Sequence, residues 1–94
     1  MLLKNGHLVD PIQAIDGIVD IRSENGVITE IGPDLPLLDG EISYDFEGKY
    51  VLPGLIDTHT HLRDPGQAYA ETFETGTKAA IHGGYTTLVS MPNT

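Results

Sequence analysis

The second half of this 94-residue sequence predicts an α/β fold. An apolar run over Leu55–His61 has the composition of a buried parallel strand, Glu71–His82 has helical periodicity, and Thr86–Met91 is a second apolar run. A strand, a helix and a strand in this order are typical of a βαβ unit, in which the two strands are parallel. In such folds, ligands bind at the carboxyl ends of the strands.

Short β-type runs punctuated by glycine fill residues 1–52. Asn5-Gly6 and Asn25-Gly26 each interrupt an alternation of apolar and polar residues, as in Gly17–Arg22 and Val27–Gly32. Asn-Gly is the strongest short hairpin signal, because both residues tolerate positive φ. We therefore expect two hairpins and a small antiparallel sheet. So few strands bury little surface, and this sheet should need a covering partner from sequence outside the chain.

The chain changes character at Pro53-Gly54. Before it, Pro33–Gly40 has the composition of a loop, while Ile42–Phe46 and Tyr50–Leu52 each predict a short strand. After it, the apolar run begins. The sequence thus divides into a β-rich part over 1–52 and an α/β part over 53–94.

The segment Glu71–His82 predicts an amphipathic helix. Its small and apolar positions follow the i, i+3, i+4, i+7, i+8 pattern: Phe73, Gly76, Thr77, Ala80 and Ile81. Glu71 and Glu74 are expected in the first turn, and Glu74 can pair with Lys78 one turn later. Gly76 costs about 1 kcal/mol relative to Ala in a helix, so we expect a close approach of helix and strand there.

Composition excludes several classes of partner. The net charge of −9, with five Lys and Arg in total, argues against binding to nucleic acid or to an anionic membrane. The amino terminus lacks the apolar core of a signal peptide, and no stretch approaches the roughly 20 apolar residues of a membrane span. We therefore expect a soluble, cytoplasmic protein, and the absence of cysteine is compatible with that compartment.

His59 and His61 are the most informative residues of the chain. Side chains alternate faces along a strand, so these two imidazoles point the same way and can share one cation, and Asp57 has the same parity. Because the chain has no cysteine, a metal here would be bound by nitrogen and oxygen, a ligand set that suits Zn, Mn, Co or Fe. The remaining donors must come from elsewhere.

Two further residues follow the predicted strands. Arg63 comes two residues after His61, and Asn93 follows the strand Thr86–Met91. An anionic substrate would meet a repulsive overall field, so it would need a local cation such as Arg63. The alternative for Arg63 is an ion pair with Asp64, and Asn93 could instead cap a loop.

Three stretches of the sequence resemble dihydroorotases of the amidohydrolase superfamily. They are PGLIDTHTHLRDPG, ETFETGTKAAIHGGYTTLVSMPNT and the amino-terminal MLLKNGHLVDP. His-x-His after an apolar strand and Pro-Gly is typical of the superfamily, whereas HLRDPG together with MPNT indicates the dihydroorotase branch. The resemblance implies that 53–94 begins a (β/α)₈ TIM-type barrel with its first βαβ unit, and that 1–52 is the amino-terminal part of a small β-sandwich.

The resemblance also implies a reaction and roles for individual residues. The reaction is the reversible hydrolysis of dihydroorotate to N-carbamoyl-aspartate in pyrimidine synthesis. His59 and His61 would bind one or two Zn²⁺ ions, while Arg63 and Asn93 would bind the substrate carboxylate. The other ligands and the general base would follow Thr94, and a full barrel takes about 250 residues. We therefore expect an amino-terminal fragment that is inactive alone.

Other functions compatible with this pattern make different use of Arg63 and the histidines. A hydantoinase or allantoinase usually differs at the position of Arg63, since a neutral ring offers no carboxylate. A non-catalytic dihydroorotase-like subunit, beside aspartate carbamoyltransferase, would tend to lose its metal ligands. The protein could also form a homo-oligomer.

We expect His7 and His82 to be surface residues, and Asp64 and Gly66 to shape a turn.

Overall fold

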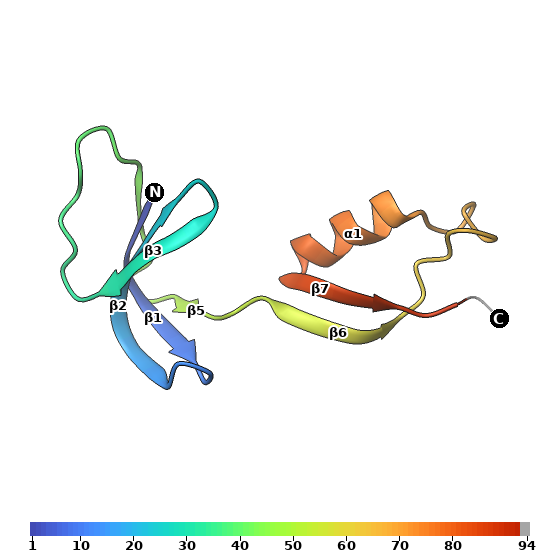
Figure 1. The fold of residues 1–94 in the computed structure, drawn as a ribbon, viewed down its shortest axis with the longest axis horizontal. Helices are drawn as coiled ribbons and strands as arrows, with labels where there is room; N and C mark the ends of the chain where they lie inside the picture. The colour runs from blue at the N-terminus through green and yellow to red at the C-terminus, as the bar shows by residue number, and fades with distance from the viewer. Residues whose placement is uncertain (93–94) are drawn as a thin grey trace. The chain divides into compact units, whose positions relative to one another are not determined.

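The chain divides into two compact units, Met1–Pro53 and Gly54–Thr94. The computed structural model describes residues 1–92 (Figure 1). The first unit contains β1 (Leu2–Asp10), β2 (Ile15–Glu24), β3 (Val27–Gly32), β4 (Ser43–Asp45) and β5 (Tyr50–Val51). The second contains β6 (Leu55–Thr60), α1 (Phe73–His82) and β7 (Tyr85–Ser90). The boundary between the units lies one residue after the predicted boundary between 1–52 and 53–94. The assignment of the units to a β-sandwich and a barrel stays a prediction.

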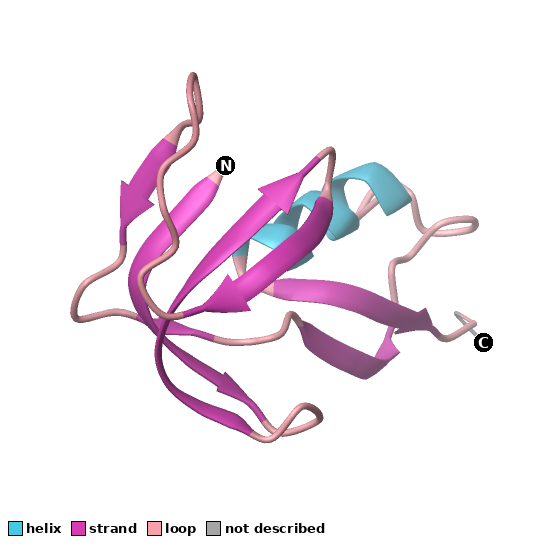
Figure 2. Ribbon diagram, turned by 60° about the vertical axis from the view of Figure 1, so that its left-hand side comes forward, coloured by secondary structure: helices cyan, strands magenta, loops and turns pink. Residues whose placement is uncertain are grey.

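The first unit is a mixed sheet rather than an antiparallel one. Strands β3, β2 and β1 are antiparallel neighbours, whereas β4 and β5 both run parallel to the other edge of β1 (Figure 2). The long loop after β3, over residues 33–42, carries the chain across to that edge, so β4 enters in the direction of β1. The prediction of a wholly antiparallel sheet is therefore wrong for these two strands.

The predicted hairpin at Asn25-Gly26 is confirmed. It joins β2 to β3, and Glu24 pairs with Val27 across the two-residue turn. Both turn residues have positive φ, 51° at Asn25 and 78° at Gly26. This backbone is the one that matches the twist of two antiparallel strands.

The second predicted hairpin, at Asn5-Gly6, is wrong. Strand β1 continues through both residues, and its pairing with β2 shifts register between Leu3 and Gly6. Asn5 has a φ of 65°, and its backbone N–H donates to Oδ1 of Asp20 at 2.8 Å. The same conformational freedom that allows a turn here produces a β-bulge.

The bulge decides which side chains of β1 share a face. Leu3 lies opposite Ile21, and beyond the bulge Leu8 lies opposite Gly17, so Leu8 and Ile21 occupy the same face. Without the extra residue, Leu8 would point to the opposite face. Leu8 and Ile21 are 5% and 7% exposed and form the apolar core of that face.

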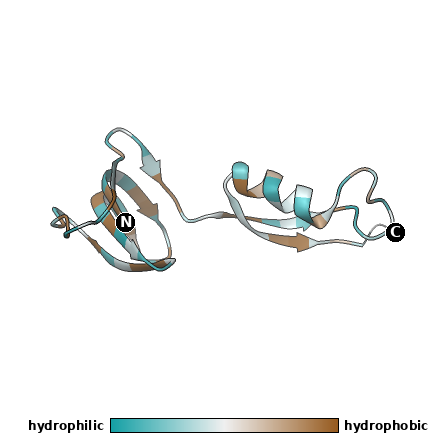
Figure 3. Cartoon of the chain, turned by 90° about the horizontal axis from the view of Figure 1, so that it is seen from above, coloured by the Kyte–Doolittle hydropathy of each residue, from teal (hydrophilic) through white to brown (hydrophobic). Residues whose placement is uncertain are grey.

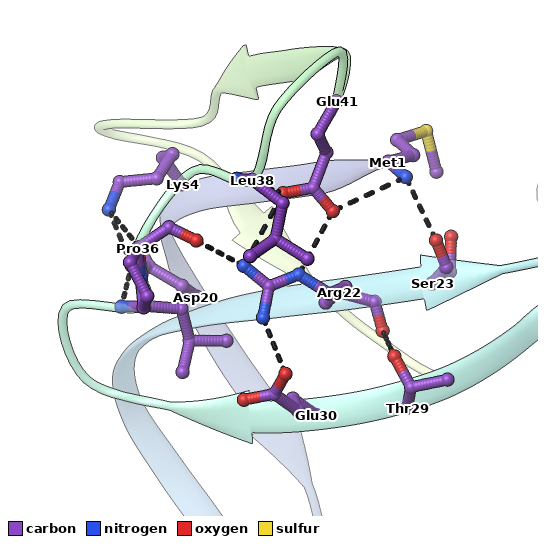
Figure 4. Close-up of polar contacts among 11 residues, drawn as sticks. Met1, Lys4, Asp20, Arg22, Ser23, Thr29, Glu30, Pro36, Leu38 and Glu41 are labelled. Carbon is purple, nitrogen blue, oxygen red and sulfur yellow. Dashed lines mark hydrogen bonds and ion pairs between the residues drawn. The ribbon is translucent and has the colours of Figure 1, made fainter.

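The opposite face of the sheet is covered by the loop 33–42 through a charged network. Arg22 is 2% exposed, and its guanidinium donates to Glu41 at 2.9 Å, to Glu30 at 2.5 Å and to the carbonyl of Pro36 (Figure 4). The hydrogen bond from Arg22 holds the pKa of the Glu41 carboxyl below its ordinary value. A buried guanidinium satisfied in this way fixes the path of the loop.

Asp20 ties the same loop to the bulge. Its carboxylate accepts hydrogen bonds from Nζ of Lys4 at 2.7 Å, from the Asn5 N–H and from the Leu35 N–H at 2.9 Å. Burial raises the pKa of Asp20, but these bonds together outweigh burial and lower the pKa. The negative form of Asp20 is therefore the one that stabilises the fold.

This network predicts loss of stability in acid. Because the folded pKa of Asp20 lies below its ordinary 3.8, its contribution is complete above that value and is lost as the pH falls below it. Asp20→Asn should lower the free energy of unfolding by about 1.5–3 kcal/mol at neutral pH. It should also weaken the fall of that free energy as the pH drops below 3.8. Amide exchange of β1 and β2 in the full-length protein measures both effects. Asp39→Asn, at an exposed position, is the control. An equal loss of stability in acid for wild type and Asp20→Asn would contradict the prediction.

The second unit confirms the predicted βαβ order. Strands β6 and β7 pair in parallel, and α1 lies along one face of the pair (Figures 1 and 2). Bands of brown and teal along α1 in Figure 3 show its amphipathic character. No helix within residues 1–92 has the length and apolar character needed to cross a membrane.

The helix begins later than expected. Thr72 is the N-cap and forms a capping box with Thr75, so Glu71 precedes the helix, and its predicted place in the first turn is wrong. Glu74 does pair with Lys78, at 2.9 Å, although both side chains are exposed and the pair contributes little.

Two glycines of this unit stand where a side chain has no room. A Cβ on Gly76 would lie 2.5 Å from Cδ2 of Leu62, so the close neighbour is a loop residue rather than the strand that we expected. A Cβ on Gly54 would overlap the side chain of Thr86, whose own Cβ would be 2.7 Å away. Because the Cβ of Thr86 is bonded to the backbone of β7, it can move away only if the strand itself moves.

Gly54→Ala should therefore destabilise the second unit by about 1–3 kcal/mol through overpacking. Gly17→Ala is a matched control, because a Cβ there would meet no atom within 4 Å. Thermal unfolding of the two full-length variants measures the difference. Equal midpoints for Gly54→Ala and wild type would contradict the prediction.

Candidate functional site

The parallel pairing of β6 and β7 brings the ends of both strands to one edge. Thr60 pairs with Ser90, and the N–H of Met91 donates to the carbonyl of Thr60 at 2.7 Å. Residues that follow β6 therefore lie beside residues that follow β7. This is the edge at which α/β folds bind their ligands.

His59 and His61 lie side by side at this edge. Their ring centroids are 5.3 Å apart, with the ring planes at 61°. His59 is in β6, and His61 follows the last residue of that strand. The expectation that alternation would place the two rings together is confirmed. That they bind a metal stays a prediction.

One nitrogen of the histidine pair is available to a ligand. Nδ1 of His61 is buried and has no hydrogen-bond partner within residues 1–92. An unpaired buried nitrogen is unusual in a folded protein and requires an explanation, which a bound ligand would supply. Neutral imidazole nitrogen is a common zinc donor. In the described part of the chain, no group of three or more histidines and carboxylates gathers around a common point, so a metal at this pair would need further donors.

Asp57 shares the parity of the histidines but has a local role. Its Oδ1 accepts the backbone N–H of His59 at 3.0 Å. This bond fixes the backbone just before the histidine pair and so orients the end of β6.

Arg63 begins the loop that leaves the histidine pair. It has a φ of 65°, its side chain is exposed, and its Nη1 donates to Oε1 of Gln67 at 3.3 Å. The ion pairs found in residues 1–92 do not join it to Asp64. Oδ2 of Asp64 instead accepts the N–H of Phe73 at 3.3 Å, at the start of α1. Asp64 thus acts on the helix rather than neutralising Arg63.

Asn93, the other predicted substrate-binding residue, lies outside the described residues. The described residues of the loop that begins at Arg63 and of the end of β7 line a hollow. The hollow is lined by Asp64, Pro65, Gly66, Gln67, Phe73, Ser90, Met91 and Pro92. Gly66 has a φ of 106°, which is strained for any residue with a side chain, in agreement with its expected role in the turn.

The other two histidines have different surroundings. Nε2 of His7 lies 2.5 Å from Oδ1 of Asp16, and its ring packs against Tyr50 with centroids 4.7 Å apart. His82 is exposed in the last turn of α1. His82 thus lies at the surface as expected, whereas His7 is half-buried. Sequence reasoning missed Asp16 and Gln67 as partners, because neither lies in a motif.

Comparison with known proteins shows which family the chain is similar to. Residues 50–94 match the Amidohydrolase family. Over all 94 residues, the chain is 56% identical to the dihydroorotase of Acetivibrio thermocellus and 50% identical to that of Trichlorobacter lovleyi. The chain spans 22% of the length of each of these curated relatives.

Solved structures agree with this similarity. A D-hydantoinase (dihydropyrimidinase) from Thermus sp. is 41% identical, with a TM-score of 0.75, and the match covers 93% of this chain and 19% of the hydantoinase. An uncharacterized protein at 19% identity and a TM-score of 0.67 shares the fold over 94% of this chain and 25% of its own. Residues 50–94 are therefore similar to the Amidohydrolase family, and the chain is similar along its whole length to the amino-terminal part of dihydroorotases.

Proposed function

We propose that the protein containing this chain hydrolyses cyclic amides with the help of a bound metal, and that its substrate is dihydroorotate. The observation that carries the proposal is the paired arrangement of His59 and His61 directly before the exposed guanidinium of Arg63. The similarity to dihydroorotases over all 94 residues supports the same reaction. A cyclic amidohydrolase is the broader class, and dihydroorotase is the specific proposal.

The histidines would hold the metal at the carboxyl end of β6. Bound Zn²⁺ supplies a water whose pKa is near 7 and polarises the carbonyl that is attacked. The work of this chain is to fix the two imidazoles, which it does with the strand pairing of β6 and β7 and with the bond from the His59 N–H to Asp57. Further ligands and the general base would come from other parts of the protein.

Arg63 would bind the carboxylate of the substrate. That group takes no part in cleavage of the ring amide, so it can be used for orientation. A planar guanidinium can donate two parallel hydrogen bonds to it. The net charge of −9 repels an anion, and Arg63 offsets this locally. Asn93, whose amide can donate another bond, is proposed as the second contact.

A hydantoinase is the second candidate function, because the Thermus D-hydantoinase has a TM-score of 0.75 with this chain. The presence of Arg63 favours the carboxylate-bearing substrate over a neutral ring. A non-catalytic subunit is disfavoured, since both histidines are retained. We also propose that residues 53–94 begin a (β/α)₈ barrel, that 1–52 belong to a β-sandwich, and that the protein acts in the cytoplasm.

Arg63→Met should lower kcat/KM for dihydroorotate about 10- to 100-fold in the full-length protein, because a charge-assisted hydrogen bond is worth about 1.5–3 kcal/mol. Arg63→Lys keeps the charge but not the two parallel donors of the guanidinium, so its kcat/KM should lie between those of Arg63→Met and wild type. Steady-state kinetics with dihydroorotate, hydantoin and allantoin measure this. Wild-type kcat/KM in Arg63→Met, or faster turnover of hydantoin than of dihydroorotate by wild type, would refute the specific proposal.

His59→Asn and His61→Asn should each reduce the zinc bound by the full-length protein, because each removes one donor from the site. Elemental analysis after dialysis measures zinc per chain. His82→Asn, at an exposed position of α1, is the matched control and should keep the wild-type content. Full zinc occupancy in both His59→Asn and His61→Asn would show that the pair does not bind the metal.

A further inference from the structure

We infer that Gln67 is a positioning residue, which holds Arg63 in place for a carboxylate without reducing the charge of its guanidinium. The inference rests on the proposed binding of a substrate carboxylate by Arg63. Gln67 itself makes no contact with the reacting atoms in this scheme.

Gln67 is bonded to Arg63 at two points. The backbone N–H of Gln67 donates to the carbonyl of Arg63 at 3.0 Å, and the side-chain Oε1 of Gln67 accepts from Nη1 of Arg63 at 3.3 Å. The first bond closes the turn that the left-handed backbone of Arg63 begins. The second directs the guanidinium along this loop, while Nε and Nη2 have no bond within residues 1–92 and stay free to donate in parallel.

Gln67 also links Arg63 to the start of the helix. Its carbonyl accepts the N–H of Ala70 at 2.9 Å and that of Glu71 at 3.4 Å, directly before the N-cap Thr72. The position of Arg63 is therefore coupled to α1 rather than left to a mobile loop. A substrate-binding side chain with fewer orientations loses less entropy on binding.

The chemistry of the amide explains why glutamine suits this position. An amide oxygen accepts a hydrogen bond but carries no net charge. A glutamate would accept the same bond and would also form an ion pair that competes with the substrate carboxylate. Asp64, the nearest carboxylate in sequence, is already bonded to the N–H of Phe73. Arg63 thus keeps its full charge for an anion.

The test measures the affinity of the zinc-loaded, full-length protein for N-carbamoyl-aspartate by calorimetry, together with KM and kcat for dihydroorotate. Gln67→Met keeps the size and removes the acceptor, and it should raise Kd and KM about three- to tenfold with little change in kcat. Gln67→Glu should raise KM further, because it neutralises Arg63. A role in packing alone would make Gln67→Glu harmless.

A double-mutant cycle with Arg63→Met separates positioning from other effects. In the Arg63→Met background, Gln67→Met should add no further loss. If Gln67→Met folds poorly, Gln67→Asn takes its place in the test. It keeps the amide but is one methylene shorter, so it should lose the bond to Arg63 and raise Kd and KM in the same way. Tyr69→Phe is the control in the same loop, since Tyr69 is 89% exposed.

The outcomes distinguish the inference from the proposed function. Additive losses in the double mutant, or a harmless Gln67→Glu, would overturn the role of Gln67 while leaving dihydroorotate hydrolysis intact. A wild-type protein that neither binds N-carbamoyl-aspartate nor hydrolyses dihydroorotate would overturn the proposed function and the inference together.

Discussion

The parallel pairing of β6 with β7 is the constraint on which the candidate site depends. The bond from the Met91 N–H to the Thr60 carbonyl sets the ends of the two strands level. The histidine pair then stands at the same edge as the residues after β7. Helix α1 connects the strands and fixes the loop 63–72, because Asp64 and Thr72 both bond to its first turn. The side chains proposed to bind a metal and an anion therefore belong to one framework.

The five lysines and arginines of this acidic chain differ in the partners of their side chains. Lys4, Arg22 and Lys78 each pair with a carboxylate, and Nζ of Lys49 lies 5.7 Å from the centre of the Phe46 ring. Arg22 is the structural extreme, since it is buried and satisfied by two glutamates and a carbonyl. The remaining cation, Arg63, bonds to an amide. A guanidinium paired with carboxylates organises a loop, whereas Arg63, which is bonded to an amide, is proposed to keep its charge for a ligand.

Local rules predicted the elements better than their connections. The dipeptide Asn-Gly makes a hairpin at residues 25–26 and a bulge at 5–6, because both structures use the same positive φ. Pairing with distant residues decides between them: the Asn5 N–H bonds to Asp20, fifteen residues away. Strand parity, in contrast, is set by the backbone alone, so the adjacency of His59 and His61 could be predicted. The parallel course of β4 could not be, since it depends on the loop 33–42.

Gln67, which sequence reasoning missed, is bonded to both the backbone and the side chain of Arg63. Gln67 has no motif of its own, and its importance comes from bonds to a carbonyl and a guanidinium that meet only once Arg63 adopts positive φ. Such a conformation is uncommon for a residue with a long side chain, so it persists only where surrounding bonds fix it. The bonds to Gln67 and the anchoring of Asp64 to α1 meet that requirement. The positive φ of Arg63 and the Nδ1 of His61, which has no hydrogen-bond partner within residues 1–92, thus lie two residues apart, next to the proposed ligand site.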